Sequence, residues 1–205
     1  MWALVEDSTI TKIINNPKAM VIGDTRHSRK IFSLWSVAEK EAIGLYEIVF
    51  DNTNKKDEAY YTNTNQSFAF AGGVVTASYG SATARPHADT LWTAQDEIDG
   101  KGTEGEVAVE GLKTKLIRTV KQQAAGELQN TDWYVVRKAD ANTAIPSAIT
   151  THRAAVRTKC AEMETAITNA VDTPALETLY TYVNTGTKEN PVMERPLGEL
   201  PTLEV

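Results

Sequence analysis

The sequence predicts an α+β fold in which a β-rich meander domain precedes an α-helical region and an extended C-terminal arm. The first part of the chain has aromatic and β-branched residues in short alternating runs, the period of half-buried strands. Residues 112–183 instead carry apolar residues three and four positions apart, the period of amphipathic helices. We therefore expect a β-rich domain over 1–93, a glycine- and acid-rich linker over 94–111, a helical domain over 112–183 and a proline-rich arm over 184–205.

Turn residues separate the predicted strands of the first domain. The opening MWALVEDSTITKII predicts a hairpin that turns at residues 6–8 and ends before Pro17. In VAEKEAIGLYEIVFDN we expect a short helical turn, a break at Gly44 and a strand over 46–50. The dipeptide Gly72-Gly73 tolerates the positive φ angles of a tight hairpin turn. The sequence therefore predicts a meander, with VAV at 107–109 as at most one further short strand.

Three helices are predicted in the second half. The first carries apolar residues at helical spacing from Leu112 to Leu128 and ends at NTDW. The second begins near Pro146, and its stripe comprises Ile149, His152, Val156, Cys160, Met163, Ile167 and Val171. In the third, Asp172 is a capping residue and Pro174 suits the first turn.

Composition excludes several classes of function. The net charge of −6 and pI near 5.2 argue against a nucleic-acid binder, because phosphate contacts need clustered cations. No run approaches the ~20 apolar residues of a membrane helix, and the N-terminus lacks the pattern of a signal peptide, so we expect a soluble, non-exported protein without membrane insertion. The single cysteine, Cys160, cannot form an intramolecular disulfide.

The stretch GDTRHSRKIF contains Asp24 and His27 among cations. The two side chains could share a metal if they lay on a helix, but a tetrahedral site needs further ligands, and no other Cys/His group is in view. The cations of this stretch could instead form a basic patch that docks an acidic partner, but a solvated loop is the favoured interpretation.

We also expect structural rather than catalytic roles for the remaining histidines and the cysteine. His87 has no Ser or Cys motif beside it, so we expect a loop residue rather than an acid or base. His152 and Cys160 share a helical stripe but lie eight residues apart, too far for a nucleophile pair; we expect a core histidine with satisfied ring nitrogens and a small core thiol.

Two further motifs lack the features of a phosphate-binding loop and of a catalytic carboxylate pair. Glycines 100, 102 and 105 lack the order of a phosphate-binding loop and are surrounded by acids that repel phosphate. Glu162 and Glu164 are two residues apart and so lie on different helix faces, which disfavours a carboxylate pair. We predict neither catalytic residues, metal nor cofactor.

The segment KLIRTVKQQAAGELQNTDWYVVRKADANTAIPSAITTHRAAVRTK resembles the C-terminal region of tailed-phage tail-fibre assembly and tail-fibre-associated proteins. That family shows an (S/T)-D-W turn followed by a helix with an aromatic-Arg-x-x-(L/V)-Arg segment. The matching residues are Thr131, Asp132, Trp133, His152, Arg153, Val156 and Arg157, with His152 where the family usually has tyrosine. MWALVEDSTITKI resembles the family's N-terminal hairpin and GLYEIVFD its next strand, and the similar stretches cover about half of the chain.

The resemblance implies a non-enzymatic virion component, made in the host cytoplasm. It would act in the tail, baseplate or fibre attachment region through interfaces with other phage tail, baseplate or fibre proteins, as a homo-oligomer or in symmetric copies. The residues expected at such interfaces are Trp133, Tyr134, His152, Arg153, Arg157, Val192, Leu197, Leu200 and Leu203. A fibre assembly chaperone absent from the mature particle is the alternative, and a small hydrolase is a third reading that rests only on scattered His and Asp residues.

Local physics predicts a structural role for NTDWYVVRK. Asp132 is expected to cap the following amides, Trp133 to pack on Leu128, and residues 134–136 to form a short strand. The stretch is therefore interpreted as a helix stop and hinge. The apolar residues of the 184–205 arm predict docking on another chain, or alternatively on the chain's own helices.

Overall fold

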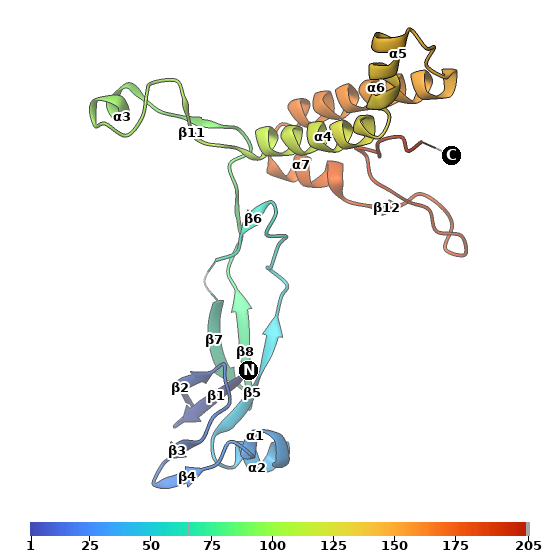
Figure 1. The fold of residues 1–205 in the computed structure, drawn as a ribbon. Coiled ribbons are helices and arrows are strands. Elements are labelled where there is room, and N and C mark those ends of the chain that lie inside the picture. The colour runs from blue at the N-terminus through green and yellow to red at the C-terminus, as the bar shows by residue number, and fades with distance from the viewer. Residues whose placement is uncertain (65, 204–205) are drawn as a thin grey trace. The chain divides into compact units, whose positions relative to one another are not determined.

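The computed structural model describes residues 1–64 and 66–203 and confirms the α+β class (Figure 1). The chain divides into two compact units, Met1–Thr83 and Ala84–Val205. The first is built on a β-sheet, and the second contains the long helices. The division falls ten residues before the end predicted for the β-rich domain at 93, because the carbonyls of Arg85, Pro86 and His87 accept hydrogen bonds from the helical unit.

A five-stranded sheet with the order β2-β1-β5-β8-β7 forms the N-terminal unit. Its strands are β1 (Trp2–Glu6), β2 (Thr9–Ile14), β5 (Leu45–Asp51), β7 (Gln66–Ala71) and β8 (Val74–Tyr79). Most neighbours are antiparallel, as in a meander, but β5 and β8 run parallel. The edge strands β2 and β7 also contact each other, so the sheet is curled.

The predicted turns are confirmed by the backbone. Asp7 and Ser8 have φ angles of 48° and 61° between β1 and β2, and Gly72 and Gly73 have φ angles of 57° and 78° between β7 and β8. Positive φ at both central residues is the geometry of a type I′ turn, whose twist matches that of the flanking strands. Both hairpins therefore form where the sequence places them.

Side chains on both faces of the curled sheet are buried, in two separate clusters. The first comprises Ala3, Val5, Ile48, Val75 and Ala77, with aromatic side chains of β5 and β7 around it. The second comprises Ile14, Ile31 and Leu45, with Trp2 and Trp35 among the half-buried side chains beside it. Short elements that cover this second face are β3 (Met20–Ile22), β4 (Thr25–His27), α1 (Ile31–Leu34) and α2 (Val37–Glu41).

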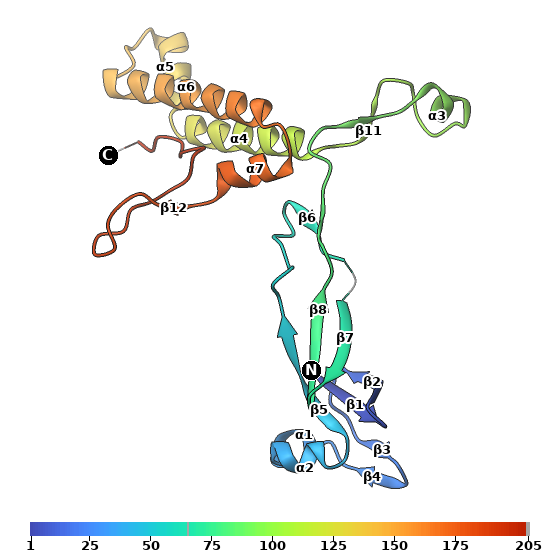
Figure 2. The same ribbon diagram turned by 180° about the vertical axis from the view of Figure 1, so that it is seen from behind.

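The helical unit is organised around two antiparallel helices, α4 (Leu112–Gln129) and α6 (Ser147–Asn169). Lys113 donates to the carbonyl of Thr168, and Lys121 pairs with Glu164 at 3.0 Å, so the start of α4 lies beside the end of α6. Figures 1 and 2 show the two helices side by side, with α7 (Thr173–Tyr180) against them. The buried side chains of α6 are Ile149, His152, Arg153, Val156, Met163 and Ile167.

The helix boundaries confirm most of the predicted signals. Asp172 caps α7 by accepting a hydrogen bond from the Ala175 amide at 2.8 Å, and Pro174 lies in the first turn. The prediction that Val171 belongs to the apolar stripe of α6 is wrong. Val171 is 77% exposed because α6 ends at Asn169 and the chain turns away before Asp172.

The segment predicted as an extended arm folds back on its own unit in part. It forms a hairpin of β12 (Val183–Asn184) and β13 (Met193–Glu194), and Leu197 beyond the hairpin is only 2% exposed. The Leu197 amide donates to the Leu179 carbonyl at 3.0 Å. Residues around Leu197 therefore cover the chain's own helices, which was the alternative reading of the arm.

The predicted linker contains regular structure. Strand β10 (Thr90–Leu91) pairs with β11 (Val107–Val109), confirming the short VAV strand, and α3 (Ala94–Ile98) lies between them. We call residues 90–109 the acidic arm. Two remaining strands, β6 (Tyr61–Thr62) and β9 (Thr83–Ala84), are two residues long.

Candidate interaction surface

A buried arginine holds together the junction between α4, the following helix α5 (Asp132–Ala141) and α6. The Arg153 guanidinium donates to the Leu128 carbonyl at 2.8 Å and to the Thr131 hydroxyl at 2.7 Å. The Thr131 hydroxyl in turn donates to the Leu128 carbonyl at 2.9 Å, and Thr131 is 1% exposed. The end of α4 is thereby fastened to α6 through polar groups that are largely buried.

Asp132 completes this junction from the start of α5. Its carboxylate oxygen lies 2.8 Å from Nη1 of Arg153, whose side chain is 10% exposed. The expectation that Asp132 caps the following amides is replaced by this ion pair. The negative charge also lies at the N-terminal end of a helix, where it interacts favourably with the helix dipole.

Residues 134–136 are helical, so the predicted short strand is wrong. Helix α5 runs without a breaker to its left-handed C-cap, Asn142, with φ of 49°. The β-branched pair Val135-Val136 favours strands locally, but the junction made by Asp132 and Arg153 sets the direction of the chain and a helix continues from it. NTDWYVVRK is a helix stop, as predicted, and also the first turns of a new helix.

Helix α5 carries an aromatic cluster, which we call the α5 patch: Trp133, which is exposed, and Tyr134 and Arg137, which are half-buried. Trp133 is 52% exposed, which corrects the expectation that its indole is buried on Leu128. The two rings lie 3.9 Å apart between centroids, and the Arg137 guanidinium lies 4.6 Å from the Trp133 ring centroid and 5.4 Å from that of Tyr134. The rings and the cation restrain one another while much of the indole faces solvent.

We expect Trp133→Ala to leave stability nearly unchanged, lowering the free energy of unfolding by no more than about 1 kcal/mol. The substitution removes an exposed cation–π contact, whereas truncating a buried tryptophan costs ~3–5 kcal/mol. Urea unfolding of the full chain measures the difference. A loss in the larger range would show that the indole packs into a core.

The other residues predicted at interfaces divide by exposure. Val192 is 47% exposed on the β12–β13 hairpin, whereas Leu200 and Leu203 are half-buried. Arg157 is exposed and its guanidinium lies 3.5 Å from the Arg153 carbonyl oxygen. Leu197, His152 and Arg153 are buried within their own unit, so in this conformation they hold the fold and present little surface to a partner.

His152 is 8% exposed, and its Nε2 has no hydrogen-bond partner among the described residues, contrary to the satisfied ring that was expected. Cys160 is half-buried and donates to the Glu164 carboxylate at 3.4 Å. Burial, followed by the neighbouring carboxylate, raises the pKa of this thiol. A raised pKa lowers the thiolate fraction at neutral pH, so the residue is a poor nucleophile, in keeping with its predicted structural role.

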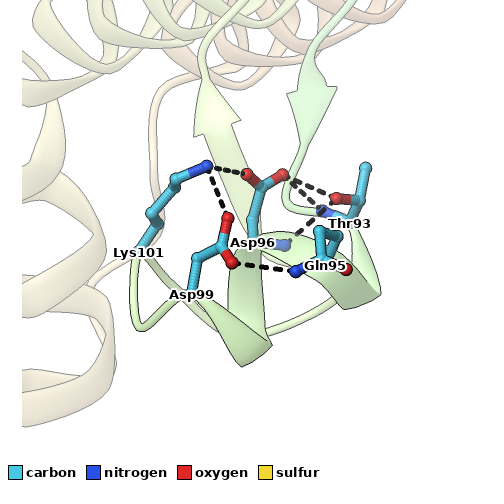
Figure 3. Close-up of polar contacts among 5 residues, drawn as sticks. All are labelled: Thr93, Gln95, Asp96, Asp99 and Lys101. Atoms are coloured by element: carbon cyan, nitrogen blue, oxygen red, sulfur yellow. Dashed lines mark hydrogen bonds and ion pairs between the residues drawn. The ribbon is translucent and has the colours of Figure 1, made fainter.

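Polar side chains between Thr93 and Lys101 of the acidic arm bond to one another (Figure 3). Thr93 and Asp96 form a reciprocal capping box at the start of α3, and Lys101 pairs with Asp96 at 2.9 Å and Asp99 at 3.0 Å. The Thr93 hydroxyl, then Lys101, lower the pKa of Asp96 to about 2. The carboxylates of Asp96 and Asp99 thus bond to Lys101 and to donors of Thr93 and Gln95 in the same loop.

The histidines near the N-terminus and before α4 have structural partners. The His27 ring packs edge-on against Trp35 with centroids 5.5 Å apart, while Asp24 is exposed in the β3–β4 turn. His87 is half-buried, and its carbonyl accepts from the Lys113 amide at 2.9 Å. Within residues 1–64 and 66–203, no three His, Cys, Asp or Glu side chains are grouped to hold a metal ion.

The sequence did not predict the roles of Arg137 in the α5 patch and of Thr131 in the buried junction beside it. Arg137 follows Trp133 by four residues, a spacing that places both on one face once the segment is known to be helical. Thr131 was assigned to a turn, yet its hydroxyl is a central acceptor for Arg153. A helix predicted to begin at Asp132 would have indicated both residues. The β-branched pair Val135-Val136 favours a strand there instead.

No helix in the described part of the chain is both long enough and apolar enough to cross a bilayer. Comparisons of the chain with protein family models, with curated proteins and with solved structures find no match.

Proposed function

We propose that this chain is a non-enzymatic structural component of a tailed-phage virion, located in the tail, baseplate or tail-fibre attachment region. It works by presenting surfaces that fix neighbouring tail, baseplate or fibre proteins. The proposal combines the resemblance of the TDW segment with one structural observation, the α5 patch with its exposed Trp133. Tryptophan, tyrosine and arginine are the residues most enriched at the energetic centres of protein interfaces.

The position of the α5 patch supports a binding role. The residues that carry the resemblance, Thr131, Asp132 and Arg153, form the junction at which α5 begins. Trp133 is the next residue along the chain and remains half exposed. A rigid junction beside an exposed aromatic residue lowers the entropy lost when a partner binds.

The alternative is a tail-fibre assembly chaperone that uses the same patch transiently and leaves before the particle matures. Quantitative mass spectrometry of purified mature particles separates the two roles. We expect this chain in a fixed stoichiometric ratio to known tail proteins. Its presence in infected-cell lysate together with its absence from mature particles would instead establish the chaperone.

Incorporation of variants tests the patch itself. We expect Trp133→Ala to reduce incorporation into particles at least tenfold, because removing an aromatic interface anchor costs ~2 kcal/mol or more of binding. Leu34→Ala is the matched control, since Leu34 is also exposed, at 72%, but lies in the N-terminal unit. Equal incorporation of both variants, with both chains folded, would remove the α5 patch from the proposal.

A further inference from the structure

The acidic arm carries unpaired apolar surface on an ordered scaffold. Ile98 at the end of α3 is 78% exposed, and Leu91, Val107 and Val109 are each about half exposed at 49%, 51% and 52%. Leu91 pairs with Val107 across the ribbon, so these two side chains lie on the same face, and Val109 pairs with Thr90 beyond a shift in the register of the two strands. An exposed apolar face of this kind is typical of an interaction site.

Internal contacts fix the shape of the arm. The Trp92 amide donates to the Glu106 carbonyl at 2.9 Å, and the Gly105 amide donates back to the Trp92 carbonyl at 3.0 Å. The indole of Trp92 packs on Gly102, where an added Cβ would lie 2.3 Å from Nε1. The loop network of Figure 3 completes this framework. The arm is thus held in shape without a core of its own.

Two carboxylate oxygens fasten the base of the arm to α4. Asp89 accepts from the Gly111 amide at 2.7 Å through one oxygen and from the Thr114 hydroxyl at 2.8 Å through the other. These bonds anchor the arm where the chain enters α4.

The arm is strongly acidic. Residues 94–106 contain five carboxylates and one lysine, a net charge of −4. Lys101 is already paired with Asp96 and Asp99. Glu97, Glu104 and Glu106 are exposed around Ile98 in the sequence.

A groove of opposite charge runs along the outer face of α4. It has a volume of about 410 Å³ and is lined by Thr114, Ile117, Arg118, Lys121, Gln122 and Ala125. Helix α4 carries four cations and one acid, a net charge of +3. Arg118 makes a bidentate pair with Glu110, and Lys121 pairs with Glu164 at 3.0 Å, but both cations remain more than half exposed.

We propose that the acidic arm of one copy docks in the α4 groove of a second copy of this chain, with Ile98 against Ile117 and Ala125. The charges of the two surfaces are opposite, and each surface offers apolar side chains that the other can bury. Because the arm and the groove are different surfaces, the contact is head-to-tail and propagates into a ring or a filament. The inference goes beyond the proposed function and does not depend on a phage role.

Sedimentation velocity of the full-length chain over a range of concentrations tests the docking. We expect self-association that weakens as salt is raised, since salt screens the charged rims. Ile98→Lys and Ala125→Glu each weaken it at least tenfold, because each loses apolar burial and gains a like charge. Val171→Lys and Ala154→Glu are the matched controls. Val171 is 77% exposed and Ala154 is exposed on α6, so both should associate like the unmodified chain.

Mixing the two defective variants distinguishes this contact from other modes of association. The Ile98→Lys chain retains its groove and the Ala125→Glu chain retains its arm, so the mixture should form dimers and nothing larger. An unmodified chain that stays monomeric to concentrations on the order of 1 mM would overturn the proposal. Association unaffected by either variant, or a mixture that forms no dimer, would also overturn it.

Discussion

Replacing Gly44 by alanine is expected to destabilise the N-terminal unit by about 3 kcal/mol or more. Gly44 has φ of +77°, which costs an L-residue ~1–2 kcal/mol, and its added Cβ would lie 2.3 Å from the Val5 carbonyl oxygen. Relieving that overlap means separating β1 from Gly44, whose carbonyl accepts from the Val5 amide at 2.8 Å. Losing a backbone hydrogen bond adds ~1 kcal/mol.

Gly23→Ala is the matched control in the same unit. Gly23 also has positive φ, at +56°, but an added Cβ meets no atom within 4 Å. We expect it to cost only the conformational part, ~1–2 kcal/mol. Hydrogen exchange of the β1 and β5 amides in the full chain reports the stability of this unit separately from the helices. Equal losses for the two variants would show that the close approach of Val5 carries no energy.

Replacing Arg153 by methionine is the second change with a large expected effect, a loss of about 2–4 kcal/mol from the helical unit. Methionine retains much of the aliphatic length but removes the donors to Leu128 and Thr131 and the partner of Asp132. Hydrogen bonds to a charged group are worth ~1.5–3 kcal/mol each. The expected loss is smaller than their sum because Asp132 is 56% exposed and recovers hydration.

Arg157→Met provides the control one turn further along α6. Arg157 is exposed, and its guanidinium lies 3.5 Å from the Arg153 carbonyl oxygen, so its replacement should change stability by no more than about 0.5 kcal/mol. Thermal unfolding followed by helical circular dichroism compares the two variants. If both melt alike, the Arg153 junction contributes nothing beyond its packing.

Much of the fold could be predicted because local signals and burial agree. Helices α4 and α6 have apolar side chains at helical spacing that are largely buried in the structure, and Asp172 caps α7 as its position implied. The parallel pairing of β5 with β8 could not be predicted, since it joins segments 27 positions apart, as in Ile48 and Val75, and leaves no mark on local periodicity. Composition predicts a linker over 94–111, because the order of this part of the acidic arm comes from polar contacts rather than from apolar spacing.

The interface residues predicted from the sequence stay predictions, but the local packing expected of Trp133 is wrong. The resemblance of the TDW segment predicts Trp133 at an interface. Local physics predicts that its indole packs on Leu128, because tryptophan is so often buried. Its exposure depends on the direction in which α5 leaves the junction. That direction is determined by the contact of Arg153 with Thr131 and Asp132 from a distant part of the sequence. Tertiary contacts of this kind override local propensity and cannot be seen in a short stretch.

The parallel pairing of β5 and β8 also determines the order in which the chain acquires its structure. A parallel pair cannot close through a tight turn, so β5 gains this neighbour only through the long connection between Asp51 and Val74. The backbone hydrogen bonds within helices α4 and α6 are local, and folding rates fall as contacts become less local. The N-terminal unit leaves the ribosome first, so it is expected to remain incompletely folded while the later helices assemble quickly. During that interval its open strand edges are the part of the chain most exposed to aggregation.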